Sequence, residues 1–410
     1  MEYGLIGEHL THSFSKQIHE YVGHYSYDLK EIAKDDLAAF LTHRNFKAIN
    51  VTIPYKETVI PYLDDISEEA KHIHAVNVIV NKNGKLIGHN TDILGFVALI
   101  KHLGLSLKDK NILILGNGGA SKAVEEGCYI LECKSVIKAS MFNEEGTISY
   151  QDIYSHQEIS IIVNATPVGM FPNNEDILID IEKFQHLEGF VDVIYNPIRT
   201  KTILKAQDQH LKAEGGLYML VAQAILAMEI FLDKKIDEAV IEQTFKKVLN
   251  ENSNIVLIGM PSSGKTTLGK LLADNLEMSF VDTDEEIIKK INMPIKDYFA
   301  QKGEPSFRDV ESEVVNQLYK KTHQVIATGG GIILRKENIE KLKQNGRLIF
   351  LDRSLENLIT SDDRPLSSNV EALKKLYDSR IELYKQYADN VVDDNDNIDA
   401  VLKKIMEICL

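Results

Sequence analysis

NIVLIGMPSSGKTTLGKLLADNL, residues 254–276, decides the fold of the second half of the chain. It begins with an apolar run typical of a buried strand, turns through GMPSSGKT and continues as an amphipathic helix. The turn matches G-x-x-x-x-G-K-[ST], with Gly259, Gly264, Lys265 and Thr266 at the fixed positions. Backbone N–H groups of such a loop form a concave nest for anions, and the helix N-terminus adds partial positive charge. The stretch therefore predicts a phosphate-binding site.

The side chains of this loop predict how a nucleotide is held. Lys265 is expected to reach the terminal phosphates, and the Thr266 hydroxyl is expected to bind Mg²⁺. Gly264 and Thr267 complete the predicted phosphate contacts. The loop alone indicates a user of nucleoside triphosphates and leaves the phosphate acceptor open.

Outward from this loop, short apolar runs alternate with amphipathic stretches, which is typical of α/β domains with parallel sheets. A chain of 410 residues is too long for one core. A helical stretch at 234–250 and the polar ENSN at 251–254 separate two series of predicted strands, so we place a domain boundary near residue 251. The first series comprises residues 2–7, 48–53, 111–116, 160–165 and 189–195, and the second comprises residues 254–259, 279–284, 324–330 and 347–352.

The composition narrows the classes of function. A net charge of −15 argues against a nucleic-acid-binding surface, because phosphate backbones select basic faces. Hydrophobic residues make up 44% and charged residues 26%, as in ordinary globular proteins. Three cysteines cannot form a disulfide framework, and we find neither a signal-peptide pattern nor an apolar run long enough to cross a bilayer. We expect a cytoplasmic protein with no membrane and no nucleic-acid partner.

Further motifs in the C-terminal half resemble shikimate kinase over residues 254–409. They are DTDEEI (282–287), GEPSFRDVE (303–311), ATGGG (327–331), RPL (364–366) and RIELY (380–384). The resemblance implies that Asp282 helps to hold Mg²⁺ and that Asp284 accepts the proton of a substrate hydroxyl. Phosphoryl transfer needs mainly positioning and neutralisation of charge, which Lys265, Mg²⁺ and Arg364 of the expected lid would supply.

The resemblance also implies which residues bind the second substrate of the kinase. Arg308 and Arg380 would hold the carboxylate of shikimate, since a planar guanidinium suits a carboxylate better than an ammonium does. Gly330 would let the backbone approach the ring. The sequence departs from the family at Ile359, where an arginine that contacts the nucleotide is usual.

In the N-terminal half, a second glycine-rich turn, GNGGAS (116–121), follows the apolar run at 111–116. It fills the first two positions of G-x-G-x-x-G, and a serine stands at the third. The next predicted strand, KSVIKASM (134–141), has no acid for the ribose hydroxyls of NAD and offers a cation and a hydroxyl, which favour the 2′-phosphate of NADP. The predicted contacts to NADP(H) are Gly116, Gly118, Gly119, Ala120, Ser121, Lys138 and Ser140.

Residues 2–250 resemble shikimate dehydrogenase. The motifs are THSFSKQIH (11–19), NVTIPYK (50–56), AVNV (75–78), HNTDILGF (89–96), NATPVGM (164–170), DVIYNP (192–197) and GGLYMLVAQA (215–224). The resemblance implies a catalytic pair in which the Lys56 ammonium donates a proton to the developing alkoxide and Asp92 orients it. It also implies that the substrate is bound by Ser13, Ser15, Thr52, Asn77, Tyr195 and Gln223. The arginine that the family usually stacks on adenine is missing, because the sequence there reads Lys138-Ala139-Ser140.

We therefore expect an α/β chain of three domains. Residues 1–95, completed by helices in 217–250, would form the substrate-binding domain, residues 96–216 a Rossmann-like NADP-binding domain, and residues 251–410 a P-loop kinase domain with a parallel sheet. The expected reactions are NADPH-dependent reduction of 3-dehydroshikimate to shikimate and its phosphorylation by ATP and Mg²⁺ to shikimate 3-phosphate.

Two alternatives stay open. One is a quinate/shikimate dehydrogenase that uses NAD and is fused to a kinase of another small polyol. The other is a regulator that binds shikimate and nucleotide without turnover, although none of the expected catalytic residues is lost. The sequence leaves the oligomeric state open.

Overall fold

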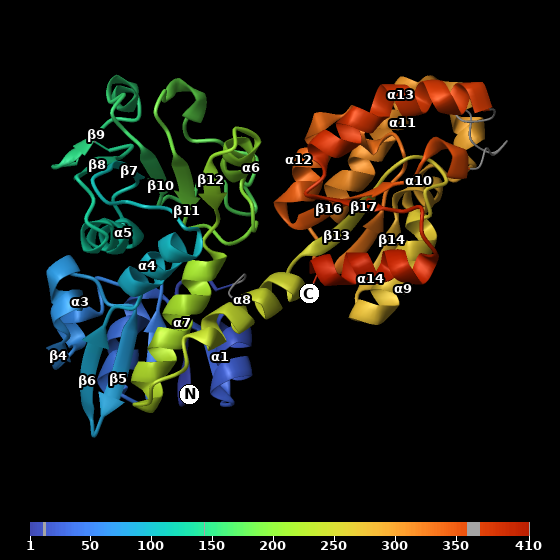
Figure 1. Cartoon of the computed structure of the whole chain (residues 1–410). Helices are drawn as coiled ribbons and strands as arrows, with labels where there is room; N and C mark the ends of the chain where they lie inside the picture. Colours follow the sequence, from blue (N-terminus) through green and yellow to red (C-terminus); the bar gives the residue numbers. More distant parts are fainter. Residues whose placement is uncertain (11–13, 143, 359–369, 410) are drawn as a thin grey trace. The chain divides into compact units, whose positions relative to one another are not determined.

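The structure is a computed structural model that describes residues 1–10, 14–142, 144–358 and 370–409. The chain divides into two compact units, Met1–Val248 and Leu249–Leu410 (Figure 1). The division falls inside helix α8 (Ala239–Glu251), a few residues before the predicted boundary. No helix of the described residues has the length and apolar character to cross a membrane.

The first sheet of the N-terminal unit has the strand order β2-β1-β3-β5-β6-β4. Strand β1 pairs in parallel with β2 and β3, but β5 is antiparallel to both β3 and β6. The strands are β1 (Tyr3–Gly7), β2 (Tyr27–Glu31), β3 (Ala48–Val51), β4 (Asp65–Ile66), β5 (Val78–Lys82) and β6 (Lys85–His89), and the helices are α1 (Ser15–Gly23), α2 (Leu37–His43) and α3 (Glu68–Ile73).

The expectation of parallel pairing was wrong for part of this sheet, and a hairpin gives the physical reason. Asn83 and Gly84 are the two residues between β5 and β6, and both have positive φ, 55° and 86°. An Asn-Gly pair in this conformation matches the twist of two antiparallel strands. The chain therefore reverses within two residues, too few for a crossover helix.

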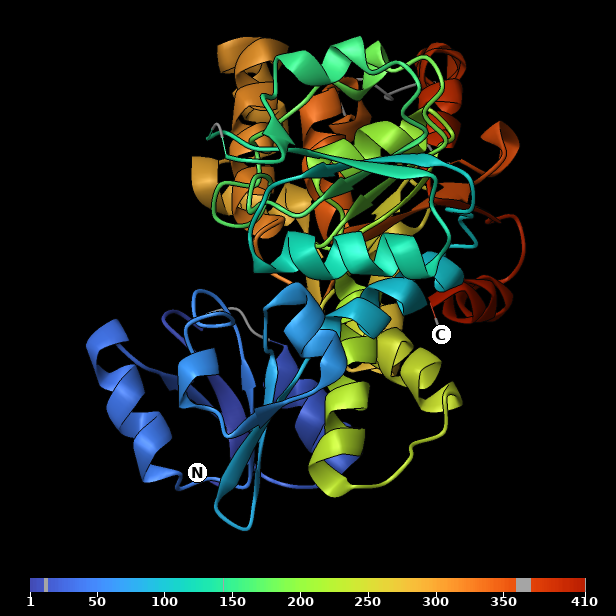
Figure 2. The same ribbon diagram turned by 90° about the vertical axis from the view of Figure 1, so that its left-hand side faces the viewer.

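The second sheet is wholly parallel, with the order β12-β11-β10-β7-β8-β9. Its strands are β7 (Asn111–Leu115), β8 (Ser135–Ala139), β9 (Thr147–Ile148), β10 (Ile161–Asn164), β11 (Gly189–Asp192) and β12 (Lys212–Glu214). Helices α4 (Asp92–His102), α5 (Gly119–Ile130) and α6 (Lys201–Asp208) accompany them, and Figure 2 shows α5 along one face of the sheet. The order turns back at β7, and dinucleotides bind at such a switch point.

After the second sheet the chain returns to the first one through α7 (Leu217–Leu232) and α8 (Figure 1). Ala227 and Phe231 of α7 share a buried cluster with Leu5, Tyr27 and Val78 of the first sheet. Helix α7 also packs against α1 and α4. This packing supports the assignment of residues 217–250 to the substrate-binding domain, which stays a prediction.

The C-terminal unit is built on a parallel sheet with the order β14-β15-β13-β16-β17. The strands are β13 (Asn254–Ile258), β14 (Ser279–Asp282), β15 (Gln324–Ala327), β16 (Gly346–Asp352) and β17 (Asn390–Asp393). The helices are α9 (Lys265–Leu276), α10 (Thr283–Ile291), α11 (Ile295–Leu318), α12 (Lys336–Gln344), α13 (Val370–Tyr387) and α14 (Ile398–Cys409). The parallel α/β fold predicted for this half is confirmed.

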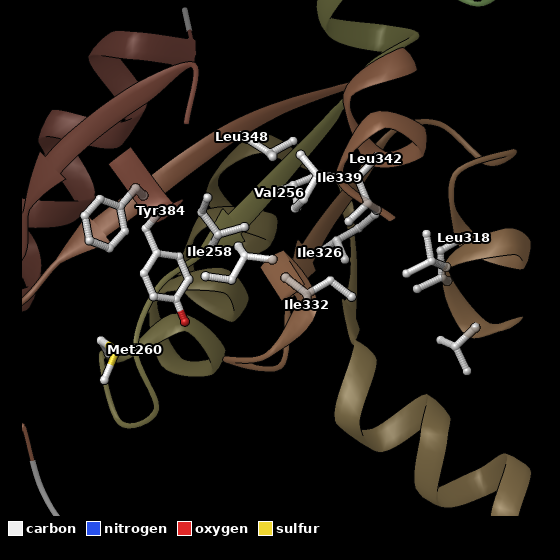
Figure 3. Close-up of a cluster of buried hydrophobic side chains, with 14 of the residues drawn as sticks. Val256, Ile258, Met260, Leu318, Ile326, Ile332, Ile339, Leu342, Leu348 and Tyr384 are labelled. Atoms are coloured by element: carbon white, nitrogen blue, oxygen red, sulfur yellow. The ribbon is translucent and has the colours of Figure 1, made fainter. Parts of the chain in front are cut away.

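The core of this unit extends from the sheet to the phosphate-binding loop. Figure 3 shows Val256 and Ile258 of β13 among side chains from β15, α12 and β16. Met260, inside the loop, is 1% exposed and belongs to the same cluster, and Tyr384 of α13 stacks on Phe350 with ring centroids 5.1 Å apart. Burial of Met260 ties the loop to the core and so limits its conformations.

Candidate functional site

Lys56 and Asp92 meet as predicted in the N-terminal unit. The Lys56 Nζ lies 2.6 Å from Asp92 Oδ2, and the side chains are 16% and 9% exposed. Lys56 stands in the turn after β3, and Asp92 is the first residue of α4. Asn90 fixes the start of this helix, because its Oδ1 accepts hydrogen bonds from the N–H groups of Asp92 and Ile93. A carboxylate in the first turn is also stabilised by the helix dipole.

Asn77 joins this pair to a second predicted side chain. Its Nδ2 donates to Asp92 Oδ1 at 2.9 Å and, at 3.4 Å, to Oε1 of Gln223 on α7. Its Oδ1 accepts from the Thr91 N–H at 2.8 Å. Since both Asp92 oxygens and the Asn77 amide are engaged, the carboxylate is held in one orientation. The structure therefore brings together Lys56, Asn77, Asp92 and Gln223.

The other predicted substrate contacts lie near the ends of the first elements. Ser15 is buried at the start of α1, and Thr52 follows β3 in the same turn as Lys56. Tyr195, after β11, has its ring centroid 5.4 Å from that of Phe14. Among the described residues, the side chains of Thr52 and Tyr195 are not hydrogen-bonded to the Lys56–Asp92 group. Ser13 lies outside the described residues.

The glycine-rich turn of the N-terminal unit lies beside Lys56. Gly116 has φ +104°, and Gly118 caps α5, whose first residue is Gly119. A Cβ on Gly119 would lie 3.6 Å from Cδ of Lys56, so the lysine chain runs against the start of α5. Ser121 is fully buried and donates from Oγ to the Gly118 carbonyl at 2.7 Å, which closes the turn. Ala120 lies in the same first turn of α5.

Lys138 and Ser140, predicted to contact the cofactor, both have partners within the protein. Lys138 Nζ lies 2.9 Å from Oε2 of Glu125 on α5. Ser140 is buried, and its Oγ accepts from the N–H of Phe142. The sequence did not reveal Glu125 as a partner, because the two residues stand on different elements.

In the C-terminal unit, the predicted phosphate loop leads from β13 into α9. Lys265 is buried and donates from Nζ to the carbonyls of Gly259 at 2.9 Å and Met260 at 2.7 Å. Gly264 has φ +77°, a conformation that favours glycine, and Thr267 lies in the first turn of α9.

Two oxygen donors stand together beside this loop. Thr266 Oγ1 donates to Asp282 Oδ2 at 2.7 Å, and Asp282 Oδ1 accepts from the Asp284 N–H at 2.9 Å. A hydroxyl and a carboxylate are hard oxygen donors of the kind that Mg²⁺ prefers. The residues present therefore fit the predicted magnesium site.

Asp284 and the two predicted arginines converge on the glycines after β15. A Cβ on Gly329 would lie 2.5 Å from Asp284 Oδ1, and one on Gly331 would overlap the guanidinium of Arg308. The Gly330 carbonyl accepts a hydrogen bond from Arg380 at 2.9 Å. A larger residue at Gly329 or Gly331 would therefore have to displace the Asp284 carboxylate or the Arg308 guanidinium. Arg364 and Ile359 lie outside the described residues.

Arg308 is held by two glutamates for which the sequence motifs predict no role. Its guanidinium contacts Glu311 through Nη1 at 2.9 Å and Glu304 through Nη2 at 2.9 Å. Glu304, Arg308 and Glu311 all follow Gly303 in α11. The helix is kinked at Gly303, whose φ of +77° is a conformation that glycine adopts easily. Burial raises the pKa of Glu311, although the positive charge of Arg308 opposes that shift.

An acidic residue missed by the sequence reasoning lies against the phosphate loop. Asp394, after β17, is 3% exposed, and burial raises the pKa of its carboxyl to about 6. Its Oδ2 lies 3.7 Å from Nη1 of Arg353, and both atoms are 3.8 Å from a Cβ built on Gly264. This pair could not be predicted from the sequence, since the two residues follow different strands and belong to no motif.

The N-terminal unit has a Lys–Asp pair beside a dinucleotide turn, which is typical of an oxidoreductase. The C-terminal unit has a phosphate loop with a Thr–Asp oxygen pair, which is typical of a phosphotransferase. The class of protein is therefore an enzyme with both kinds of unit in one chain. Comparison with known families agrees. The family model for the shikimate dehydrogenase substrate binding domain matches residues 5–79, and that for shikimate kinase matches residues 261–410.

Known proteins are similar to the N-terminal unit. A shikimate dehydrogenase (NADP(+)) of Clostridium beijerinckii is 35% identical over 267 residues, which cover 61% of this chain and 98% of the relative. The crystal structure of shikimate dehydrogenase 1 from Peptoclostridium difficile is 34% identical, with a TM-score of 0.56, and covers 60% of this chain and 98% of that one. A chorismate mutase/shikimate 5-dehydrogenase fusion protein from Clostridium acetobutylicum is 33% identical, with a TM-score of 0.57, and covers 60% and 96%.

The chain belongs to the shikimate dehydrogenase family and carries a shikimate kinase domain at its C-terminal end. The predicted fusion is confirmed, and the chain is a bifunctional enzyme of the shikimate pathway.

Proposed function

We propose that the N-terminal unit reduces 3-dehydroshikimate to shikimate with NADPH and that the C-terminal unit transfers a phosphoryl group from ATP to the 3-hydroxyl of shikimate. The relative's name supports NADP as the cofactor. The observation that carries the proposal is the Lys56–Asp92 pair, 2.6 Å apart and beside the dinucleotide turn. Such a pair suits the reduction of a ring ketone.

In the reduction, NADPH supplies the hydride when bound. Lys56 donates a proton from Nζ to the oxygen that becomes the alkoxide, so one hydride and one proton convert the ketone to the alcohol. Asp92 and Asn77 orient the ammonium through the hydrogen bonds described above. Ser15, Thr52, Tyr195 and Gln223, together with Ser13 outside the described residues, are proposed to hold the substrate.

In the phosphorylation, ATP supplies the phosphoryl group when bound, and Thr266 and Asp282 would hold Mg²⁺. Asp284 accepts the proton of the 3-hydroxyl, whose oxygen bonds to the terminal phosphorus while the bond to ADP breaks. Lys265 neutralises phosphate charge after leaving the carbonyls of its own loop. Arg308 and Arg380 hold the carboxylate beside the glycines at 329–331.

Steady-state rates separate this proposal from the alternatives. We expect oxidation of NADPH with 3-dehydroshikimate to be much faster than with 3-dehydroquinate. Faster turnover of 3-dehydroquinate would establish the quinate alternative. A chain that bound shikimate and nucleotide but turned over neither ketone would be the regulator.

Arg308→Lys is expected to raise the KM for shikimate about 10- to 100-fold, with little change in the KM for ATP. A lysine keeps a positive charge near Glu311 but cannot pair with a carboxylate through two parallel hydrogen bonds. Loss of hydrogen bonds to a charged group costs about 1.5–3 kcal/mol. Initial kinase rates over a range of each substrate measure both constants.

Arg335→Lys is the matched control, because Arg335 pairs with Asp309 at 2.6 Å and is not among the nearest atoms that a Cβ on the three glycines would meet. If Arg308→Lys left the KM for shikimate within twofold of the control, Arg308 would not bind the carboxylate.

A further inference from the structure

The alternation of side chains along β8 decides what Lys138 can do. Val136 packs with Val124 and Cys128 of α5, whereas Ile137 and Ala139 belong to the cluster on the opposite face of the sheet. Since alternate residues of a strand share a face, Lys138 lies on the α5 side with Val136. There it pairs with Glu125 at 2.9 Å, with side-chain exposures of 21% and 26%. The one cation predicted for the 2′-phosphate is therefore already neutralised by a half-buried carboxylate.

A second carboxylate is bound to the glycine-rich turn itself. Asn117, between Gly116 and Gly118, donates from Nδ2 to Glu144 Oε2 at 2.7 Å. The turn is next to the end of β8, because the Gly116 N–H donates to the Ala139 carbonyl at 2.8 Å. Glu144 thus reaches the turn from the segment that follows β8. Glu144 lies three residues beyond the predicted strand at 134–141, which contains no acid.

These two acids lie beside the place where a bound dinucleotide would be expected to put its adenosine half. With its diphosphate at the start of α5, the adenosine ribose would be near the end of the neighbouring strand, here β8. NADP brings a further phosphate to that ribose, and NAD brings two hydroxyls. A carboxylate accepts hydrogen bonds from hydroxyls and repels a phosphate. Lys138, Glu125 and Glu144 together leave one net negative charge at this place.

We propose that Glu125 and Glu144 set the cofactor selectivity of the dehydrogenase unit by opposing the 2′-phosphate. Glu125 pairs with Lys138, so that this ammonium is not available to the 2′-phosphate. Glu144 places a negative charge close to the same phosphate. The preference for NADPH over NADH is consequently small. This proposal rests on the proposed dehydrogenase function and concerns the same site.

Glu125→Gln and Glu144→Gln test the proposal, because each removes a charge with little change in shape. Titrations of the full chain with NADPH and with NADH, followed by nucleotide fluorescence, give the ratio of the two dissociation constants. We expect each variant to raise the selectivity for NADPH about five- to tenfold, the size of one charge interaction at a partly exposed site. The ratio of kcat/KM for the two cofactors with 3-dehydroshikimate should shift in the same direction.

Glu126→Gln is the matched control. Glu126 is the next residue of α5, is 25% exposed and pairs with His72 at 3.0 Å, away from Lys138. The Glu126→Gln variant should leave the ratio of the two dissociation constants within twofold of that of the unaltered chain. In a Lys138→Gln chain, Glu125→Gln should lose most of its effect, because no cation is then released.

The proposal is overturned if either Glu125→Gln or Glu144→Gln shifts the binding ratio less than threefold, or if Glu126→Gln shifts it as much. The titrations need no turnover, so they separate this outcome from a failure of the proposed function. If the variants show the expected shifts in cofactor binding but the unaltered chain does not reduce 3-dehydroshikimate, the role of Glu125 and Glu144 is supported and the proposed reaction is refuted.

Discussion

Replacing Lys56 by alanine should lower the rate of 3-dehydroshikimate reduction by about 10²–10⁴-fold, the usual contribution of general acid catalysis. Lys56 is the ammonium that the structure places beside both Asp92 and the dinucleotide turn. Asp92 keeps its hydrogen bond from Asn77 in the variant, so its carboxylate stays partly satisfied. The affinity for NADPH should change little, because the lost group acts on the ketone oxygen. Rates of NADPH oxidation at saturating substrate measure the effect.

Lys122→Ala provides the control for this prediction. Lys122 lies on α5 and pairs with Glu57, the residue after Lys56, at 2.8 Å. Its ion-pair partner is therefore a neighbour of Lys56 and not Asp92, Asn77 or Gln223. It should retain most of the reduction rate. The same Lys56→Ala preparation should phosphorylate shikimate normally, which shows that the C-terminal unit is folded, and unchanged affinity for NADPH shows the same for the N-terminal unit. A variant that kept more than about a tenth of the reduction rate would remove Lys56 from the role of proton donor.

Asp284→Asn should remove most phosphoryl transfer, with a loss of about 10²-fold or more in kcat. An amide has nearly the shape of the carboxylate but cannot accept the proton of the 3-hydroxyl. The asparagine amide fits against Gly329 in the place that the Asp284 carboxylate occupies in the unaltered chain. Binding of shikimate should therefore be largely preserved. Formation of ADP at saturating ATP and shikimate measures the rate, and a titration with shikimate measures the affinity.

Glu285→Gln is the matched change at the next residue of α10, which is exposed, and it should leave the kinase rate nearly unaltered. Reduction of 3-dehydroshikimate should be normal in both variants. Should Asp284→Asn turn over at a rate close to that of Glu285→Gln, another group must accept the proton.

Much of the fold could be predicted from local sequence patterns. The strand–turn–helix unit around Gly264 and the parallel sheet that contains it follow from hydrophobic runs and a loop with fixed glycine positions, so the sequence was sufficient. The antiparallel strand β5 was not predicted. Its signal was present in Asn83-Gly84, a two-residue turn that demands a hairpin, but the alternation of strands and helices elsewhere outweighed it.

The candidate sites show where sequence reasoning ends. Lys56 and Asp92 could be paired because two motifs of one family name them. Glu125 could not be paired with Lys138, because that contact depends on which face of β8 meets α5. Glu311 stood in a quoted motif, yet only its burial next to Arg308 shows that it holds the guanidinium. Contacts between elements that carry no shared motif need the packed structure.

The most direct test of two consecutive reactions in one chain is a single incubation of the purified protein with 3-dehydroshikimate, NADPH, ATP and Mg²⁺. NADPH oxidised, ADP formed and shikimate 3-phosphate formed would be measured together over time. We expect the three amounts to become equal, with shikimate present only as an intermediate. Oxidation of NADPH with shikimate as the final product, and no ADP, would contradict the kinase assignment, and ADP formed only after added shikimate would contradict the reductase assignment.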